Sequence, residues 1–157
     1  MSSSPAQNYP VSQSVVRARI EEVGLDAVGM IRQMNAAIFN EERVINTFDR
    51  EDLTILIAWM DTEPAGFKIG YRENRFVFYS AKGGVLPQYR RRGLARQLLF
   101  YMMDEARNRG YVRFAYDTFP NRDRGMTVLG LNEDFRVVKA DFNKTYNDWR
   151  LRFEKRL

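Results

Sequence analysis

The sequence predicts an α/β (α+β) fold with a mixed central sheet of six to seven strands. The apolar positions change between a helical and a strand period along the chain, and a strand–helix–strand unit near the middle places two strands parallel. The 157 residues are 45% hydrophobic and 29% charged, which is the balance of one soluble domain. We expect a flexible tail rich in Ser, Gln and Asn over residues 1–13 and a single domain over residues 14–157.

The first third of the chain is predicted to form one strand and two helices. Apolar residues that alternate with arginines predict a strand over residues 15–22. Asp26 opens a helix whose apolar residues recur at spacings of three and four as far as Asn40. A second, shorter helix is expected over residues 42–48.

Three antiparallel strands are predicted next, because the apolar pattern changes to the period of a sheet. One run is almost continuously apolar, one alternates, and one is rich in aromatic and β-branched residues, with turn residues between them. The predicted strands span residues 53–60, 64–71 and 75–85.

The last part of the chain is predicted to supply two helices and three strands. An apolar helical face runs from Leu94 to Ala106, and Gly110 stands where a helix commonly ends. The strands on either side of this helix, 75–85 and 111–116, should therefore be parallel. A short helix over 126–131 and strands over 135–146 and 149–154 complete the order.

Composition excludes several classes of chemistry. The sequence has no cysteine and no histidine, so it holds no disulfide, Cys/His zinc site, thiolate nucleophile or imidazole-based triad, and we expect no metal. A net charge of +5 indicates a mild attraction for phosphates or acidic surfaces. No apolar run reaches the roughly 18 residues that a membrane span needs, so we expect a cytoplasmic protein without a membrane partner.

One segment carries the pattern of an anion site. It ends a strand, turns and begins a helix, so unpaired backbone N–H groups and the positive end of a helix dipole meet there. Four arginines in seven residues add charge, and small residues let a phosphate approach the backbone. The alternative is a solvated arginine face beside a tight glycine turn. The segment is Gly83-Gly84-Val85-Leu86-Pro87-Gln88-Tyr89-Arg90-Arg91-Arg92-Gly93-Leu94-Ala95-Arg96.

This segment differs from the ATP-type P-loop and from the dinucleotide fingerprint. Its pattern Arg90-x-x-Gly93-x-Ala95, preceded by Val85-x-Pro87, instead resembles the Q/R-x-x-G-x-G/A motif of the GNAT N-acetyltransferases. The resemblance extends to the order of elements from about residue 15 to residue 154. It implies helices on both faces of the sheet and a V-shaped splay between two parallel strands, which end near Val85 and Tyr116. Acetyl-CoA, or a related acyl-CoA, would lie in that splay.

The resemblance also implies which residues hold the cofactor. Backbone N–H groups of residues 91–96 would bind the pyrophosphate, and the strand edge of residues 84–86 would pair with the pantetheine arm. Gly83 and Gly84 fit the bulge of this strand better than a loose bend. Asn121 would line the cleft, or else cap the loop after Pro120. The predicted cofactor-binding residues are Gly84, Val85, Leu86, Arg90, Arg91, Arg92, Gly93, Leu94, Ala95, Arg96 and Asn121.

For catalysis, the resemblance implies direct attack of an amine on the thioester, with the Val85 N–H stabilising the oxyanion. Asp117, at the end of a strand, is the candidate base, and its alternative role is to begin a turn. The tyrosine that commonly protonates the thiolate in this family falls at Gly130. Tyr116, Tyr146 or water could replace it, or acetyl transfer is weak or absent.

The amine acceptor is expected to be a small molecule or a protein or peptide, in a pocket between residues 26–48 and the final hairpin. A non-catalytic CoA- or anion-binding module of the same fold is the alternative function. The positive charge also suggests nucleic-acid binding, but no recognised motif pairs it with surface aromatics, so we expect no nucleic-acid partner. A homodimer is the common default for soluble oligomers.

Overall fold

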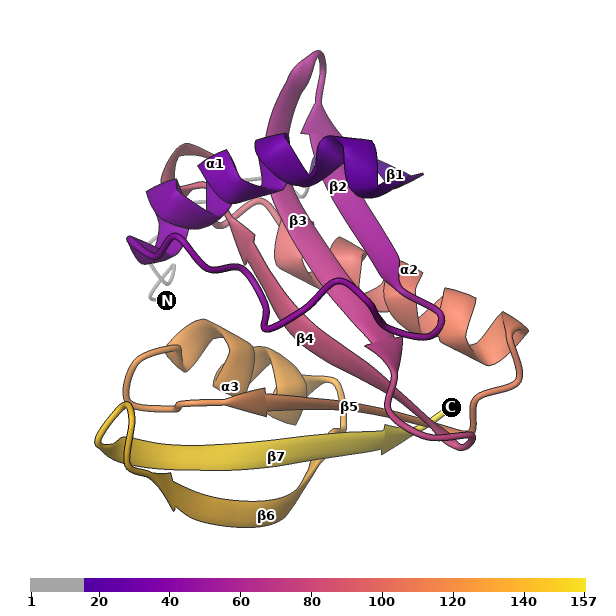
Figure 1. The fold of residues 1–157 in the computed structure, drawn as a ribbon, viewed down its shortest axis with the longest axis vertical. Coiled ribbons are helices and arrows are strands. Elements are labelled where there is room, and N and C mark those ends of the chain that lie inside the picture. Colours follow the sequence, from indigo (N-terminus) through magenta and orange to yellow (C-terminus); the bar gives the residue numbers. More distant parts are fainter. Residues whose placement is uncertain (1–15) are drawn as a thin grey trace, which may run out of the picture.

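The computed structural model describes residues 16–157, which form one seven-stranded mixed sheet with helices on both faces (Figure 1). The strand order is β1-β2-β3-β4-β5-β7-β6, so the predicted fold class is confirmed. The predicted tail over residues 1–13 lies outside the described residues. The strands are β1 (Arg19–Val23), β2 (Thr54–Met60), β3 (Glu63–Arg72), β4 (Val77–Val85), β5 (Arg113–Thr118), β6 (Arg136–Asn143) and β7 (Asp148–Arg156). The helices are α1 (Val28–Phe39), α2 (Leu94–Asn108) and α3 (Arg124–Asn132), with 3-10 turns at Leu25–Ala27 and Pro87–Tyr89.

The sheet opens in its middle, between the parallel strands β4 and β5. These strands pair only over Val77–Ser80 and Arg113–Tyr116. Beyond Ser80, β4 continues to Val85 while paired with β3 alone. The predicted V-shaped splay is therefore present, and it begins where β4 loses its partner.

Two apolar cores cover the two faces of the sheet. On one face Ile31 and Met34 of α1 pack against Ile57, Phe67 and Ile69. Because successive strand residues point to opposite faces, the residues between these belong to the second core. There Leu98 and Met102 of α2 pack with Leu56, Phe78 and Tyr116. Figure 1 shows α1 and α2 on opposite sides of the sheet.

The helix predicted over residues 42–48 is not formed. Asn40 has a left-handed backbone (φ 55°), which ends α1, and the chain then runs irregularly to β2. The buried Asn35 side chain donates to the backbone oxygens of Glu41 (2.9 Å) and Arg43 (3.3 Å), which holds this segment against the core. Its apolar residues, such as the buried Val44, thus serve burial rather than a helical face.

The start of β1 and the bulge in β4 also differ from the prediction. Residues 16–18 precede β1 and are not part of a strand. In β4 the extra residue is Ala81, because Ile69 pairs with Lys82 and Gly70 with Ser80. Gly83 and Gly84, which follow the bulge, pair regularly with β3. Because they have no side chains, they leave room for neighbouring side chains. A Cβ at Gly84 would come within 3.1 Å of Ile38 in α1.

Candidate functional site

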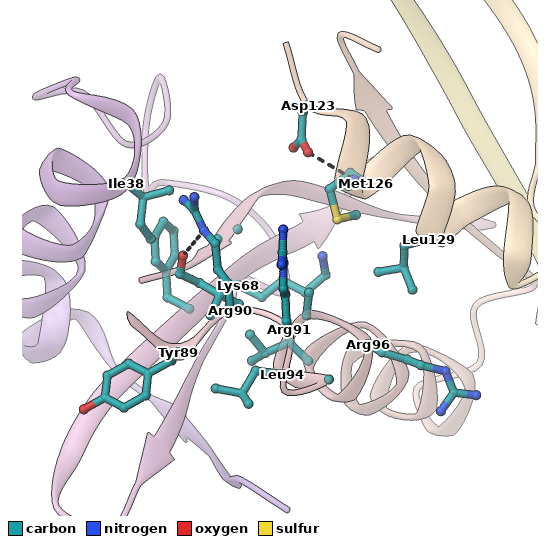
Figure 2. A pocket seen from close by; sticks show the side chains of 18 of the residues that line it. Ile38, Lys68, Tyr89, Arg90, Arg91, Leu94, Arg96, Asp123, Met126 and Leu129 are labelled. Atoms are coloured by element: carbon teal, nitrogen blue, oxygen red, sulfur yellow. Dashed lines mark hydrogen bonds between the residues drawn. The ribbon is translucent and has the colours of Figure 1, made fainter. Parts of the chain in front are cut away.

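A cleft of about 690 Å³ opens at the splay between β4 and β5 (Figure 2). Its walls come from the end of α1, the middle of β3, the end of β4, the following loop, the start of α2 and the loop that begins α3. Since residues of both sheet faces line it, among them Ile38 of α1 and Leu98 of α2, the cleft reaches from one face toward the other.

The first turn of α2 presents unpaired backbone donors to this cleft. The first N–H of the helix with a backbone acceptor is that of Gln97, which donates to Gly93 O at 3.1 Å. Within residues 16–157, no backbone acceptor faces the N–H groups of residues 91–96, and no side chain caps the helix. Arg91 (φ 62°) and Gly93 (φ 80°) are both left-handed, which turns the loop sharply into the helix. Free donors at the positive end of a helix dipole form an anion site.

The end of β4 offers a free strand edge beside this anion site. Leu86 donates its N–H to Ala65 O of β3 at 2.8 Å. Because backbone donors alternate in direction along a strand, the Val85 N–H points toward the gap. Leu86 is not part of the cleft wall and its N–H is used within the sheet, so its position does not support the predicted contact with the cofactor.

The arginines of the motif divide into two groups. Arg90, Arg91 and Arg96 line the cleft, as do Gly84, Val85, Gly93, Leu94 and Ala95. Arg90 also donates through Nε to Val85 O at 3.1 Å, which ties the loop to the strand edge. Arg92 lies outside the cleft, with its guanidinium 5.8 Å from the centre of the Tyr89 ring. The prediction that Arg92 binds phosphate is therefore not supported by its position.

The loop before α3 contributes different residues from the one predicted. Asn121 is absent from the cleft wall and donates to Asp148 Oδ1 at 2.9 Å. This matches its alternative role as a loop residue. Two residues later, Asp123 lines the cleft and caps α3, since its Oδ1 accepts the Met126 N–H at 3.0 Å. Asp123 was missed, although an aspartate just before an apolar helical run is a recognised capping signal.

Asp117 lies on the sheet face turned away from α2 and α3. Its neighbour Tyr116 belongs to the core beneath those helices, so the Asp117 side chain points to the other face. There the Tyr79 hydroxyl donates to Asp117 Oδ2 at 2.5 Å. Burial, together with the adjacent Asp117 carboxylate, raises the pKa of Tyr79. Asp117 does not line the cleft, and its role as a base stays a prediction.

Tyr116 and Tyr146 are the predicted replacements for the family's tyrosine, whose position is Gly130 in this chain. Neither of them reaches the cleft. A Cβ at Gly130 would overlap the hydroxyl oxygen of Tyr116, which donates to Met126 O at 2.9 Å. Tyr116 is buried against Phe153, and burial raises its pKa. Tyr146 lies in the turn between β6 and β7, where its ring packs against Phe119. Neither residue is part of the cleft wall.

Lys68 in β3 is a cleft residue that the sequence reasoning missed. Its side chain is only 4% exposed, and burial lowers its pKa to about 8, although Asp123 opposes this effect. The sequence carried no signal of this burial, because a lysine between Phe67 and Ile69 in the alternating strand 64–71 is expected on a polar face, whereas the structure buries it. Such a position is unusual, because buried lysines are rare unless they are paired.

Fold, splay and anion site together define an acetyltransferase that uses acetyl-CoA. The model of the Acetyltransferase (GNAT) family matches residues 26–126, and the chain belongs to this family. The residues present fit acetyl-CoA, since free N–H groups face its pyrophosphate position and a free strand edge extends beside them. The chain is thus an acyl-CoA-dependent N-acyltransferase by family, with acetyl-CoA as its co-substrate.

Solved structures share this fold at low sequence identity. An IAA acetyltransferase from Bacillus cereus has a TM-score of 0.78 and 16% identity, with 90% of this chain and 100% of that chain covered. The ribosomal-protein-S18-alanine N-acetyltransferase from Escherichia coli has a TM-score of 0.77 and 15% identity, covering 89% and 94%. A GNAT family acetyltransferase from Elizabethkingia anophelis with acetyl-CoA bound has a TM-score of 0.76 and 14% identity, covering 89% and 98%. No curated protein sequence matches the chain.

No helix among residues 16–157 is long and apolar enough to cross a membrane. The same part of the chain brings no three His, Cys, Asp or Glu side chains together as a possible metal site.

Proposed function

We propose that the protein transfers the acetyl group of acetyl-CoA to an amine by direct attack, with the cofactor in the cleft between β4 and β5. The main support is the unbroken series of free backbone donors over residues 91–96, directly beside the unpaired end of β4. The thioester supplies an activated acetyl group when acetyl-CoA is bound. The chain's own residues then hold the cofactor, orient the carbonyl and move protons.

The pyrophosphate would accept hydrogen bonds from the N–H groups of residues 91–96. Arg90 and Arg91 add positive charge from the loop, and Arg124 adds it from the opposite wall. The pantetheine arm has amide groups like a peptide, so it would pair with β4 in place of the missing strand partner, through Gly84 and Val85. We place Leu86, Arg92 and Asn121 outside the set of cofactor contacts.

The reacting carbonyl would lie at the end of β4 that faces the gap. There the Val85 N–H would donate to the oxyanion that forms when the amine attacks. A lysine-like amine has a pKa of about 10.4, so its free base costs on the order of 4 to 5 kcal/mol at neutral pH. Asp117 is our candidate for accepting the amine proton, directly or through water, and Tyr79 positions it by donating to Oδ2.

The acceptor would approach from the face of the sheet that carries Asp117 and Tyr79. The irregular segment after α1, which bonds to Lys82 of β4 through Glu41 and Arg43, and the β6–β7 hairpin border this face. Our acceptor class is a small-molecule amine or a protein or peptide amine. A cytoplasmic location and a homodimer stay predictions made from the sequence.

Calorimetric titration with CoA and a thiol-release assay with acetyl-CoA test this function together. The amine panel should include polyamines, aryl amines, a lysine peptide and a peptide with N-terminal alanine. Because the chain has no cysteine, every thiol detected comes from CoA. We expect CoA binding and amine-dependent thiol release. Binding without release across the panel would support the alternative, a non-catalytic CoA-binding module, and absence of binding would contradict both.

A further inference from the structure

Lys68 is a buried cation with no ion-pair partner in contact among residues 16–157. Its side chain is 4% exposed, and no carboxylate among residues 16–157 lies within 4.0 Å of its ammonium. No hydrogen-bond acceptor in the described chain reaches it either. Three other lysines are paired: Lys82 with Glu41 at 2.7 Å, Lys139 with Asp141 at 3.6 Å and Lys155 with Glu133 O at 2.7 Å. Burying an unpaired charge costs folding free energy, and this cost is offset when a bound group of opposite charge pairs with it.

The absence of a side chain at Gly83 leaves room for Lys68 to extend into the cleft. The two residues are directly opposite each other in the β3–β4 ladder. A Cβ at Gly83 would lie 3.3 Å from Lys68 Cγ, so the missing side chain leaves room for the lysine stem beside β4. Figure 2 shows Lys68 projecting among the residues that line the cleft.

The position of Lys68 is at the acyl end of the cleft rather than at its phosphate end. Gly83 precedes Val85, our oxyanion donor, by two residues along β4, whereas the anion site follows Val85. The charge that acts on the pKa of Lys68 is Asp123, at the start of α3. The other charged residues that share the cleft wall are Arg90, Arg91, Arg96, Arg122 and Arg124.

Few other groups in the cleft wall could deliver a proton there. The arginines keep their protons at any physiological pH. Asp123 accepts the Met126 N–H as the cap of α3, and Tyr89 belongs to the loop at the phosphate end. Tyr116 is held by Met126 O and occupies the space beside Gly130, outside the wall.

We propose that Lys68 is the acid that protonates the CoA thiolate as it leaves. This inference rests on the proposed function. The amine nitrogen bonds to the thioester carbonyl carbon, and collapse of the tetrahedral intermediate breaks the C–S bond and leaves the electron pair on sulfur. A proton then passes from Lys68 Nζ to sulfur, giving the CoA thiol and a neutral lysine that regains its proton from water. The proton lost by the amine goes to the base on the opposite face of the sheet.

The chemistry of an amine at this position suits the step. Before proton transfer, the ammonium stabilises the negative sulfur by its charge. Burial brings the pKa of Lys68 to about 8, near the value of about 8.5 for a thiol, and proton transfer is most effective between groups of matched pKa. At neutral pH Lys68 is still mostly protonated, as an acid must be.

The test measures the thiol of CoA bound to the protein, and it needs no acceptor. The rate of alkylation by iodoacetamide, followed by mass spectrometry across pH, gives the apparent pKa of the bound thiol. In the wild type we expect a value measurably below that of free CoA, since a nearby opposite charge lowers the pKa of a thiol. Lys68→Met should remove the shift, and Lys68→Arg should keep it. The control is Lys139→Met, which changes an exposed lysine in β6 and should behave as wild type.

Turnover with an amine from the panel separates the acid from a merely charged residue. Lys68→Met and Lys68→Arg should both lower kcat by about 100-fold, with the CoA dissociation constant within about threefold of the wild type. Arginine keeps the charge but does not release its proton, so loss of kcat with a retained thiol shift supports the proposal.

Three results would overturn it. An unchanged thiol pKa in a folded Lys68→Met variant that binds CoA normally would refute the role of Lys68 and leave the proposed function standing. Acetylation of Lys68 itself, seen as an added 42 Da on that residue after incubation with acetyl-CoA, would make it an acceptor instead of an acid. Wild-type protein that does not bind CoA would refute the proposed function and this inference with it.

Discussion

The two ends of the cleft are built in different ways. The phosphate end consists mainly of backbone N–H groups from one continuous segment, residues 91–96, at the start of a helix. The end that we assign to the acyl group depends on side chains from separate elements: Lys68 of β3 and the cap residue Asp123 before α3 line the cleft, and Asp117 of β5 lies outside its wall on the other face of the sheet. The first end therefore depends on local conformation, and the second depends on which strands lie side by side.

This difference shows which changes should abolish binding and which should slow chemistry. Blocking the backbone donors should remove the cofactor, because no side chain replaces them. Changing a side chain at the acyl end should leave the cofactor bound and alter proton transfer or stability.

Gly93→Glu should have the largest effect, a loss of CoA affinity of more than about 100-fold. Gly93 is left-handed with φ 80°, which costs an ordinary residue roughly 1 to 2 kcal/mol. Glutamate also adds a negative charge and bulk beside the pyrophosphate. Calorimetric titration with CoA measures the loss, and circular dichroism verifies the fold. Gly93→Ala is the matched control and should bind more weakly than wild type but far better than Gly93→Glu; equal affinity of Gly93→Glu and wild type would place the anion site elsewhere.

Lys68→Met should stabilise the ligand-free protein at pH 7, by at most about 3 kcal/mol. The pKa of Lys68 falls from 10.5 to about 8 on folding, so the unfolded chain binds more protons between these values. The resulting penalty is fully present below pH 8 and is relieved as the pH rises to 10.5. Urea unfolding of both proteins should show a difference that shrinks over this range. A variant less stable than wild type at pH 7 would show that Lys68 is paired in the folded protein.

Asp117→Asn should reduce turnover by about 100-fold and leave CoA affinity unchanged, because it removes the carboxylate that we propose as the base. Steady-state kinetics with an amine from the panel, together with CoA titration, measure both quantities. Tyr79→Phe, which removes only the hydroxyl that donates to Asp117, should cost less. Wild-type activity in Asp117→Asn would contradict the role of Asp117 as a base and favour its alternative role, a residue that ends a strand and begins a turn.

Gly130→Ala should destabilise the protein by about 1 to 3 kcal/mol, the usual cost of overpacking. The added methyl group would overlap the Tyr116 hydroxyl. In the double variant with Tyr116→Phe, the overlapping oxygen is gone, so part of the loss should be recovered. Thermal unfolding of the two single variants and the double variant gives the coupling, and strictly additive losses would argue against contact between the two positions.

The sequence predicted most strands and the helix α2 well, and it pointed to the free donors at the start of α2, because the patterns that indicate them are local. The period of the apolar residues identifies the strands and α2, and the strand–turn–helix motif around Gly93 identifies the donors. The helix predicted over residues 42–48 was wrong because Asn35, a buried side chain from α1, holds that segment in an irregular path. Local periodicity carries no information about such a distant contact.

The side chains that line the acyl end of the cleft were harder to predict, because contacts between separate strands place them there. The position of Lys68 beside the cleft depends on its pairing with Gly83. That register follows from the bulge at Ala81, whereas the sequence had suggested a bulge at Gly83 and Gly84. Gly130 was recognised as a departure from the family, but the side chain that fills its space, Tyr116, comes from another strand. Leu86 and Arg92 lie within the motif, yet neither is part of the cleft wall: the Leu86 N–H is bonded within the sheet, and the Arg92 guanidinium lies over the Tyr89 ring.

The most direct test of the cleft is an NMR titration of ¹⁵N-labelled protein with CoA. Backbone donation to the pyrophosphate and to the pantetheine predicts the largest amide shifts at residues 91–96 and at Val85, with small shifts at Leu86 and Asn121. Saturable CoA binding that leaves the amides of residues 91–96 unmoved would contradict the account.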